Sequence, residues 1–153
     1  MTRLAEHLTT NLDREAAFRY VADFSRQAEW DPNTVSSRRI DAGQLGVGAR
    51  FALEVRMGRK TVPMEYRITE YEAPRKVVLV GEGGGVWSQD VITFTDVPDG
   101  TRVDYGAEIR LGGLLGLAQP LLGPALTRIA RGAVEGMQRE LDRKVGSSSV
   151  ESA

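Results

Sequence analysis

Two polar residues fall where a strand pattern would turn them toward an apolar core. In the segment from Val86 to Thr95, Ile92 and Phe94 set the inward parity of a period-two strand, which also directs Ser88 and Asp90 inward. A carboxyl group in an apolar interior has a raised pKa and can give or take a proton near neutral pH. Asp90 is therefore a candidate catalytic residue. The alternative is that it lies at a strand end or bulge near solvent.

Two tyrosines, Tyr66 and Tyr105, point inward by the same parity in neighbouring alternating segments. A tyrosine in a cavity wall can pack its ring on a ligand and offer its hydroxyl to the ligand's polar group. Both are candidates for ligand binding and for proton transfer beside Asp90. Alternatively, the rings only fill the core and the hydroxyls bond to backbone or water.

Other kinds of chemical site have little support. The chain has no cysteine and a single histidine, His7, so thiolate nucleophiles, disulfides and histidine-based metal sites are excluded. The glycine-rich stretch GEGGGVW lacks the Gly-Lys-Ser/Thr of a phosphate-binding loop and is typical of a loose hairpin. His7 and Glu6 are interpreted as ordinary residues of the first strand. We expect no metal and no cofactor.

Length and composition predict one globular domain. The chain has 153 residues, of which 41% are hydrophobic and 27% charged, and its net charge of -1 gives no sign of nucleic-acid binding. No apolar run reaches the ~20 residues that a bilayer requires, and the N-terminus lacks the apolar core of a signal peptide. We expect a cytoplasmic protein without stable membrane insertion, with a domain over residues 1–145 and a disordered tail over residues 146–153.

The elements that must position these residues alternate between two periods. A strand over Leu4–Thr10 is followed by two short helices, the second ended by Pro32. From Thr34 onward the period is two, interrupted by turn signals, which predicts six strands in a meander. Pro63 indicates an edge or a bulge in its strand.

The last long segment, from about Leu114 to Val145, has the period of an amphipathic helix. Its apolar face predicts about 24 helical residues lying on the inner face of the sheet. Gly132 and Gly136 lie on this helix, where they allow a close approach or leave room for a ligand or a partner chain. The apolar face comprises Leu122, Leu126, Ile129, Ala133, Met137 and Leu141.

The segment GGLLGLAQPLLGP joins the last strand to this helix and carries no charge. We expect a buried connection. A portal flap and a membrane-touching segment are the alternatives.

Four segments of the sequence resemble the START-like, or helix-grip, superfamily (SRPBCC). This superfamily includes the birch-pollen allergen and polyketide cyclases and dehydrases. The four segments are AFRYVADFSRQAEWDP, YRITEYEAPRKV, VITFTDVPDGTRVDYGAEIRLGG and the Leu/Pro-rich start of the last helix. The resemblance covers about Arg3 to Val145. It implies an α+β helix-grip fold, in which a curved antiparallel sheet of seven strands wraps around the long C-terminal helix and two short helices lie between strands 1 and 2. It also implies an elongated apolar cavity between helix and sheet.

The function that we expect is the binding or transport of a hydrophobic small molecule, such as a lipid, isoprenoid or aromatic metabolite, in that cavity. The expected lining residues are Trp30, Phe51, Leu53, Val55, Met64, Tyr66, Ser88, Asp90, Phe94, Tyr105, Leu126, Ile129 and Met137.

Two alternatives come from other classes. The first is an enzyme of the polyketide cyclase or dehydrase type, with Asp90 and Tyr66 or Tyr105 as proton-transfer groups. Cyclases of the family are thought to use a pocket arginine, whereas parity turns Arg67 outward, so binding without catalysis is favoured. The second is a partner-binding subunit with a filled cavity, such as a homodimer.

Overall fold

The computed structural model describes the backbone of residues 1–152 and the side chains of residues 1–146. Its elements, in chain order, are β1 (Thr2–Thr10), α1 (Arg14–Val21), the 3-10 turn η1 (Phe24–Arg26), α2 (Gln27–Trp30), β2 (Thr34–Arg39), β3 (Arg50–Met57), β4 (Lys60–Glu72), β5 (Lys76–Gly83), β6 (Val86–Val97), β7 (Gly100–Leu111) and α3 (Gly113–Ser152).

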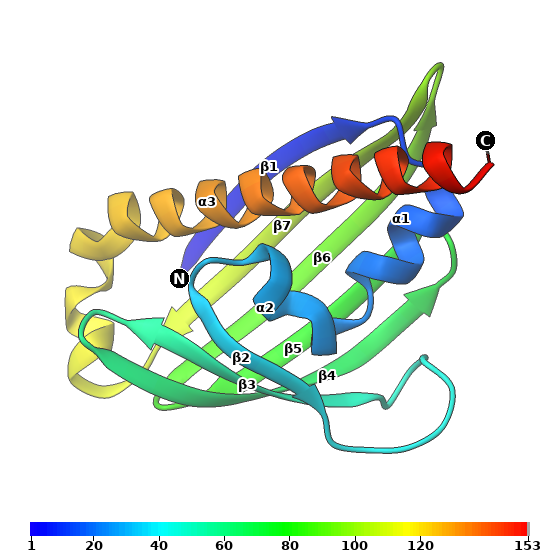
Figure 1. Cartoon of the computed structure of the whole chain (residues 1–153). Helices are drawn as coiled ribbons and strands as arrows, with labels where there is room; N and C mark the ends of the chain where they lie inside the picture. The colour runs from blue at the N-terminus through cyan, green and yellow to red at the C-terminus, as the bar shows by residue number, and fades with distance from the viewer. Residues whose placement is uncertain (153) are drawn as a thin grey trace.

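The seven strands form one antiparallel sheet in the order β1-β7-β6-β5-β4-β3-β2. Figure 1 shows the sheet curving around α3, with α1 and α2 on the same side as that helix. Each strand after β2 pairs with its predecessor, and β1 closes onto β7. The expected α+β architecture is confirmed, with seven antiparallel strands, two short helical segments after the first strand and a long C-terminal helix.

The strand faces follow the alternation in the sequence. Phe51 and Leu53 are buried on β3, and Met64, Tyr66 and Ile68 are buried on β4, while the residues that alternate with them face outward. Pro63 pairs with β3 only, because the ladder between β4 and β5 begins two residues later. The strand is thus an edge at Pro63, where the missing N–H is harmless.

The helix α1 begins where the sequence offers a cap. The Asp13 side chain accepts a hydrogen bond from the Ala16 amide, and Glu15 adds negative charge to the first turn. The buried side of this helix includes Phe18 and Val21, which pack into the core of the molecule. A strong cap and one apolar stripe are sufficient to hold an eight-residue helix against the sheet.

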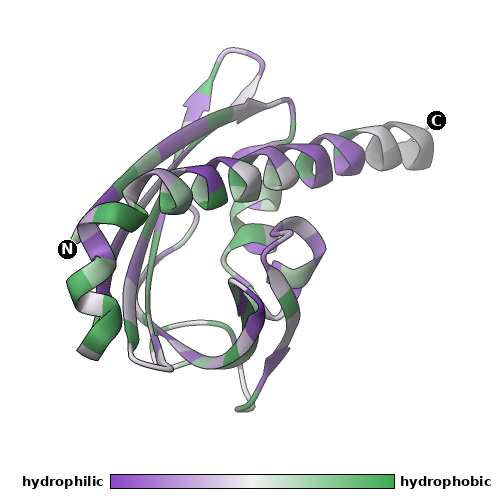
Figure 2. Cartoon of the chain, turned by 90° about the vertical axis from the view of Figure 1, so that its left-hand side faces the viewer, coloured by the Kyte–Doolittle hydropathy of each residue, from purple (hydrophilic) through white to green (hydrophobic). Residues whose placement is uncertain are grey.

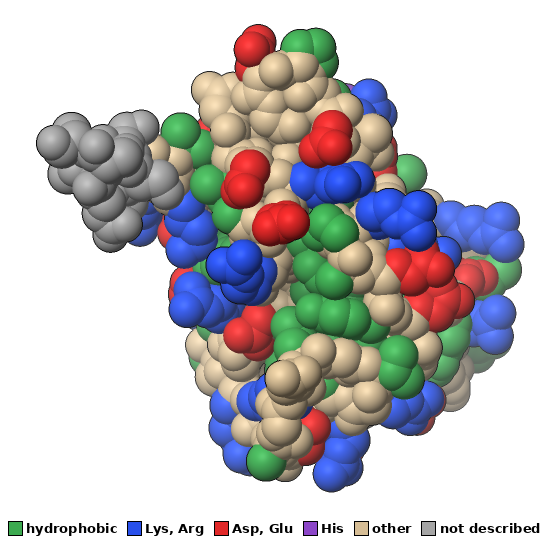
Figure 3. Space-filling model, turned by 90° about the vertical axis from the view of Figure 1, so that its right-hand side faces the viewer, with side chains coloured by type: hydrophobic (Ala, Val, Ile, Leu, Met, Phe, Trp, Pro, Cys, Tyr) green, Lys and Arg blue, Asp and Glu red, His purple; other side chains and the backbone are tan. Residues whose placement is uncertain are grey.

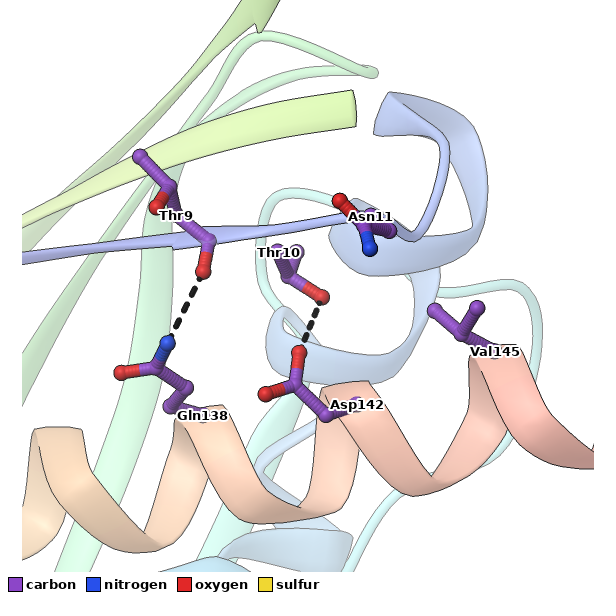
Figure 4. A pocket seen from close by; sticks show the side chains of 6 residues that line it. All are labelled: Thr9, Thr10, Asn11, Gln138, Asp142 and Val145. Carbon is purple, nitrogen blue, oxygen red and sulfur yellow. Dashed lines mark hydrogen bonds between the residues drawn. The ribbon is translucent and has the colours of Figure 1, made fainter. Parts of the chain in front are cut away.

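The C-terminal part of α3 is fastened to the sheet. Met137 and Leu141 are fully buried. Figure 4 shows two hydrogen bonds to the end of β1, in which Thr10 Oγ1 donates to Asp142 at 2.8 Å and Gln138 donates to the Thr9 carbonyl at 3.0 Å.

The helix is longer than expected at its C-terminal end. A disordered tail was expected over residues 146–153, but α3 continues through Ser152, and Ala153 lies outside the described residues. Pro120 and Pro124 lie inside its first turns, where α3 changes direction (Figure 1). A proline removes a helical hydrogen bond and kinks the helix, which accounts for the bend.

The first turns of α3 are not the buried connection that we expected. Leu114, Leu117 and Leu121 have 86%, 80% and 83% of their surface exposed. Apolar composition alone does not ensure burial, because a segment is buried only where another element covers it. One side of these turns lies against the sheet, where buried Gln119 bonds to Ile109 and Leu111 on β7 and to Thr2 on β1. The leucines lie on the side that no other described element covers.

The two glycines of α3 have different roles. A Cβ atom at Gly136 would overlap the carbonyl oxygen of Trp30, so α2 and α3 meet at a point where only glycine fits. A Cβ atom at Gly132 would lie 3.8 Å from the nearest atom, on Pro32, which is ordinary contact. Close approach therefore explains Gly136 but not Gly132.

We predict that Gly136→Ala destabilises the fold by about 2 kcal/mol or more, because the added methyl group forces α2 and α3 apart. The matched variant Gly132→Ala is expected to stabilise it by up to ~1 kcal/mol through helix propensity. Urea unfolding followed by circular dichroism measures both. Equal effects of the two substitutions would contradict the close approach at Gly136.

Candidate functional site

A buried carboxyl group lies at the centre of the sheet's inner face. Asp90 on β6 is 4% exposed and accepts two hydrogen bonds, from Ser88 Oγ at 3.0 Å and from the Tyr105 hydroxyl at 2.6 Å. No ion pair to Asp90 occurs among the described residues. The structure thus brings together three of the residues that sequence parity selected, and their neutral hydroxyl groups leave the carboxylate charge uncompensated.

The register of the strands sets this geometry. Ser88 and Asp90 lie two residues apart on β6 and therefore share a face, while Tyr105 comes from β7, diagonally across the ladder. On the other side, Tyr66 on β4 faces Gly81 on β5, and a Cβ atom at Gly81 would overlap its ring. The glycine lets the Tyr66 ring lie over β5 and approach the cluster.

Burial governs the protonation of the cluster. It raises the pKa of Asp90 from 3.8 to about 6, and the nearby charge of Asp31 adds to this, while the hydrogen bonds from Tyr105 and Ser88 oppose it. Burial and then the Asp90 charge also raise the pKa of Tyr66 and of Tyr105. Both phenols therefore remain protonated donors at neutral pH, beside a carboxyl group that changes its charge near that pH.

An aromatic wall faces the cluster from the short helices. The ring of Trp30 lies edge-on to Tyr105 with centroids 6.4 Å apart, and Phe24 lies 5.4 Å from the ring of Tyr66. Trp30 is almost fully buried, yet its indole Nε1 has no hydrogen-bond partner among the described residues. A buried N–H without a partner is rare, which marks a place where a ligand atom or a water molecule would be stabilised.

A second polar group beside this wall was not foreseen from the sequence. Asp31, at the end of α2, is buried and accepts hydrogen bonds from the side chains of Gln27 and Thr34. The Gln27 Oε1 atom has no partner among the described residues. Helical spacing could not reveal this group, because Gln27 lies on α2, Asp31 caps its C-terminal end and Thr34 already belongs to β2.

The other expected lining residues fall into two groups. Six are buried in the core, and four keep accessible surface. The buried ones are Trp30, Phe51, Leu53, Met64, Phe94 and Met137, and the partly or largely accessible ones are Val55, Tyr105, Leu126 and Ile129.

The accessible residues mark one end of the molecule. On β3 and β4 the inner face is buried near Leu53 and Met64 but partly exposed at Val55 and Val62, toward the hairpin that joins these strands. On α3, Met137 is buried while Ile129, two turns earlier, is 40% exposed. Apolar surface of both sheet and helix thus becomes accessible toward the same end.

Two surface hollows lie elsewhere. One, of about 280 Å³, lies between the end of β1 and α3 and is lined by the groups that fasten the helix, including Gln138 and Asp142 (Figure 4). The other, of about 290 Å³, lies between α1 and the turn after β4, where Phe18, Tyr71 and Pro74 give it an apolar floor; Figure 3 faces this side and shows hydrophobic side chains in a hollow. Neither hollow is lined by the Asp90 cluster.

The remaining candidates are structural in character. His7 is exposed on the outer face of β1. Glu6 lies 3.9 Å from the guanidinium of Arg131 on α3 and so joins helix to sheet. Among the described residues, no three histidine or acidic side chains lie together as a metal site would require. None of the described helices has both the length and the apolar character needed to cross a bilayer.

Solved structures share this arrangement. A protein from Thermus thermophilus has a TM-score of 0.77 at 14% identity, over 91% of this chain and 96% of its own. A START superfamily protein from Mycobacterium smegmatis has a TM-score of 0.70 at 14% identity, over 96% and 99%. The ZhuI aromatase/cyclase from Streptomyces sp. R1128 has a TM-score of 0.74 at 14% identity, over 94% of each chain. These likenesses establish the helix-grip fold.

A comparison with curated proteins finds no match. The sequence does match the family described as polyketide cyclase / dehydrase and lipid transport, over residues 1–143, which is nearly the whole chain. The resemblance to polyketide cyclases and dehydrases noted from the sequence is thereby confirmed, and the chain belongs to this family.

Proposed function

We propose that the protein binds a hydrophobic small molecule whose single polar group reaches the Asp90 cluster. The observation that carries the proposal is the buried carboxyl group of Asp90, which has hydroxyl partners but no cationic partner among residues 1–146. Burying such a group weakens folding unless something compensates, and perturbed carboxyl groups in an apolar interior concentrate at functional sites. A ligand carrying a hydroxyl or carbonyl group would supply the missing polar contact.

The body of the ligand would lie on the accessible apolar surface. Val55 and Ile109 on the sheet and Leu126 and Ile129 on α3 keep surface that a ligand could cover. Covering apolar surface contributes ~25 cal/mol per Å² removed from water, which is enough for micromolar affinity with a ligand of modest size. The half-buried ring of Tyr105 connects this surface to the carboxyl group of Asp90.

The polar group of the ligand would form hydrogen bonds with donors of the protein and with one acceptor, the carboxylate of Asp90. A ligand carbonyl could accept from the free indole N–H of Trp30 or from a tyrosine hydroxyl, and a ligand hydroxyl could donate to Asp90. No strong positive charge lies in the cluster, so a neutral polar group suits it better than a carboxylate. This pattern supports lipids, isoprenoids or aromatic metabolites that bear a hydroxyl or a ketone.

A second candidate function is proton transfer of the dehydrase type. The pKa of Asp90 near 6 favours it, because a general base works best when its pKa lies close to the ambient pH. With a β-hydroxy ketone, Asp90 would remove the proton between the two functions while the indole N–H of Trp30, which has no partner among the described residues, donates a hydrogen bond to the ketone oxygen. The hydroxyl would then leave as water with the proton returned by Asp90, and the product would be the enone.

We expect the purified protein to carry a stoichiometric small molecule, or to take up the neutral dye Nile red with micromolar affinity. Ala107→Trp, which adds bulk on the inner face of β7 opposite Asp90, should weaken dye binding at least ~10-fold by occupying the ligand's place. Native mass spectrometry and fluorescence titration measure the two effects.

The matched control for dye binding is Ala52→Trp, on the outer face of β3 between Phe51 and Leu53, which should leave the affinity unchanged. The melting temperature of each variant shows that the fold survives. An empty protein that also takes up no dye would refute the binding proposal.

The pH dependence of stability should report the burial of Asp90. Its pKa is raised to about 6 in the folded protein, so its favourable contribution is complete below pH ~4 and is lost as the pH rises through ~6. We predict that from pH 4 to pH 7 the wild type loses ~2 kcal/mol of unfolding free energy relative to Asp90→Asn. The exposed substitution Glu54→Gln is the control and should track the wild type. Parallel curves for Asp90→Asn and wild type would rule out the raised pKa.

If the chain is a dehydrase, Asp90→Asn should abolish conversion of a β-hydroxy ketone to its enone, because asparagine cannot accept the proton. Nile red affinity should change much less than turnover. Enone absorbance and dye titration separate the two. A wild-type protein that binds the dye but produces no enone supports binding without catalysis.

A further inference from the structure

The first turns of α3 present a leucine surface to solvent. Leu114, Leu117 and Leu121 are spaced by three and four residues, which puts them on one side of the helix, and each is at least 80% exposed. The stretch from Gly113 to Thr127 contains no charged residue at all. Figure 2, which faces this end of the molecule, shows the first turns of α3 largely in the hydrophobic colour. We call these three residues the leucine surface.

Two turns of the sheet lie at the same end. The Gly112 amide donates to the Gly85 carbonyl at 2.7 Å, so the start of α3 lies against the turn between β5 and β6. A Cβ atom at Gly84 in that turn would overlap the side chain of Val62, near the start of β4. The hairpin between β3 and β4 therefore lies beside the turn between β5 and β6. Figure 1 shows these connections and the first turns of α3 at one end of the sheet.

The charge around the leucine surface is mainly positive. Residues 56–62, 82–87 and 108–121 supply Arg56, Arg59, Lys60 and Arg110 against Glu82 and Glu108. Among the described residues, the three basic groups of the hairpin form no ion pair.

An amphipathic aromatic residue lies beside one of these charges. The Arg110 guanidinium lies over the ring of Trp87 at 4.8 Å. Exposed leucines, a tryptophan and basic side chains at one end are the combination by which proteins settle in the interface of a membrane.

We propose that this end of the molecule docks reversibly on the surface of an anionic lipid bilayer. The leucine surface would enter the acyl boundary, while Arg56, Arg59 and Lys60 meet the lipid phosphates. Apolar insertion and charge attraction are each weak alone, and stable peripheral binding needs two such signals together. The chain offers both signals in adjacent segments.

A second copy of this chain fits the surface less well. A stable protein interface buries about 800 Å² on each partner, and three leucine side chains supply only a fraction of that area. A symmetric dimer through the same patch would also bring the basic hairpins of both copies together, which disfavours association by repulsion. A negatively charged membrane meets neither difficulty.

The test is flotation with vesicles made of equal parts of phosphatidylglycerol and phosphatidylcholine, compared with phosphatidylcholine alone. We expect binding to the anionic vesicles and a steep decline with salt, since ions screen the attraction. The triple variant Leu114→Ser, Leu117→Ser and Leu121→Ser should lower the partition coefficient about a hundredfold. The double variant Arg59→Glu and Lys60→Glu should lower it at least ~10-fold and remove the preference for anionic lipid.

The control is Val47→Ser, because Val47 is 69% exposed in the connection between β2 and β3 and should not affect binding. Melting temperatures should be unchanged in all variants, since the altered side chains are exposed. Wild-type protein that stays unbound in low salt, or binding that survives the triple variant, would overturn the proposal. A dimer that forms without lipid and that the triple substitution dissociates would also overturn the proposal, because a second copy of the chain would then occupy the leucine surface.

Discussion

The structure depends on how α3 is fastened to the sheet. Its C-terminal part is fixed by the buried side chains of Met137 and Leu141, by the close contact of Gly136 with α2, and by two hydrogen bonds to β1. Its first turns bend at prolines and are held to the sheet by the buried side chain of Gln119, which bonds to Ile109 and Leu111 on β7 and to Thr2 on β1. Between these two attachments, near Ile129, α3 leaves apolar surface accessible.

The Asp90 cluster lies between the aromatic residues of the short helices and the accessible apolar surface. Aromatic rings of the short helices keep it dry on one side, and the half-buried Tyr105 connects it to accessible apolar surface on the other. The low polarity of the surroundings raises the pKa of the carboxyl group, and hydroxyl partners hold it in place without neutralising it. A site of this kind suits a guest with one polar end, whether the guest is carried or converted.

The sequence was sufficient to predict the architecture, because the spacing of a few apolar residues is enough to show whether a segment has the period of a helix or of a strand. Ile92 and Phe94 were enough to orient Ser88 and Asp90 correctly, and the two tyrosines followed from the same rule. Parity could not predict which inward residues keep accessible surface, since this depends on the packing of α2 against α3. It also could not separate Gly136 from Gly132, nor reveal that the leucines of α3 lack cover, because both depend on distances between elements remote in sequence.

The order of the strands has a consequence for how the protein folds during its synthesis. Thr2 pairs with Ile109 and Thr10 with Thr101, so the first strand made has no partner until the last strand is complete. The helix that covers the sheet follows later still. During synthesis β2 to β6 can pair one after another as hairpins, whereas the N-terminal strand must wait with its hydrogen-bonding groups unpaired. Closure of the sheet is thus a late, long-range event, and a nascent chain that ends before Gly100 has neither a partner for its first strand nor a helix to cover its apolar face.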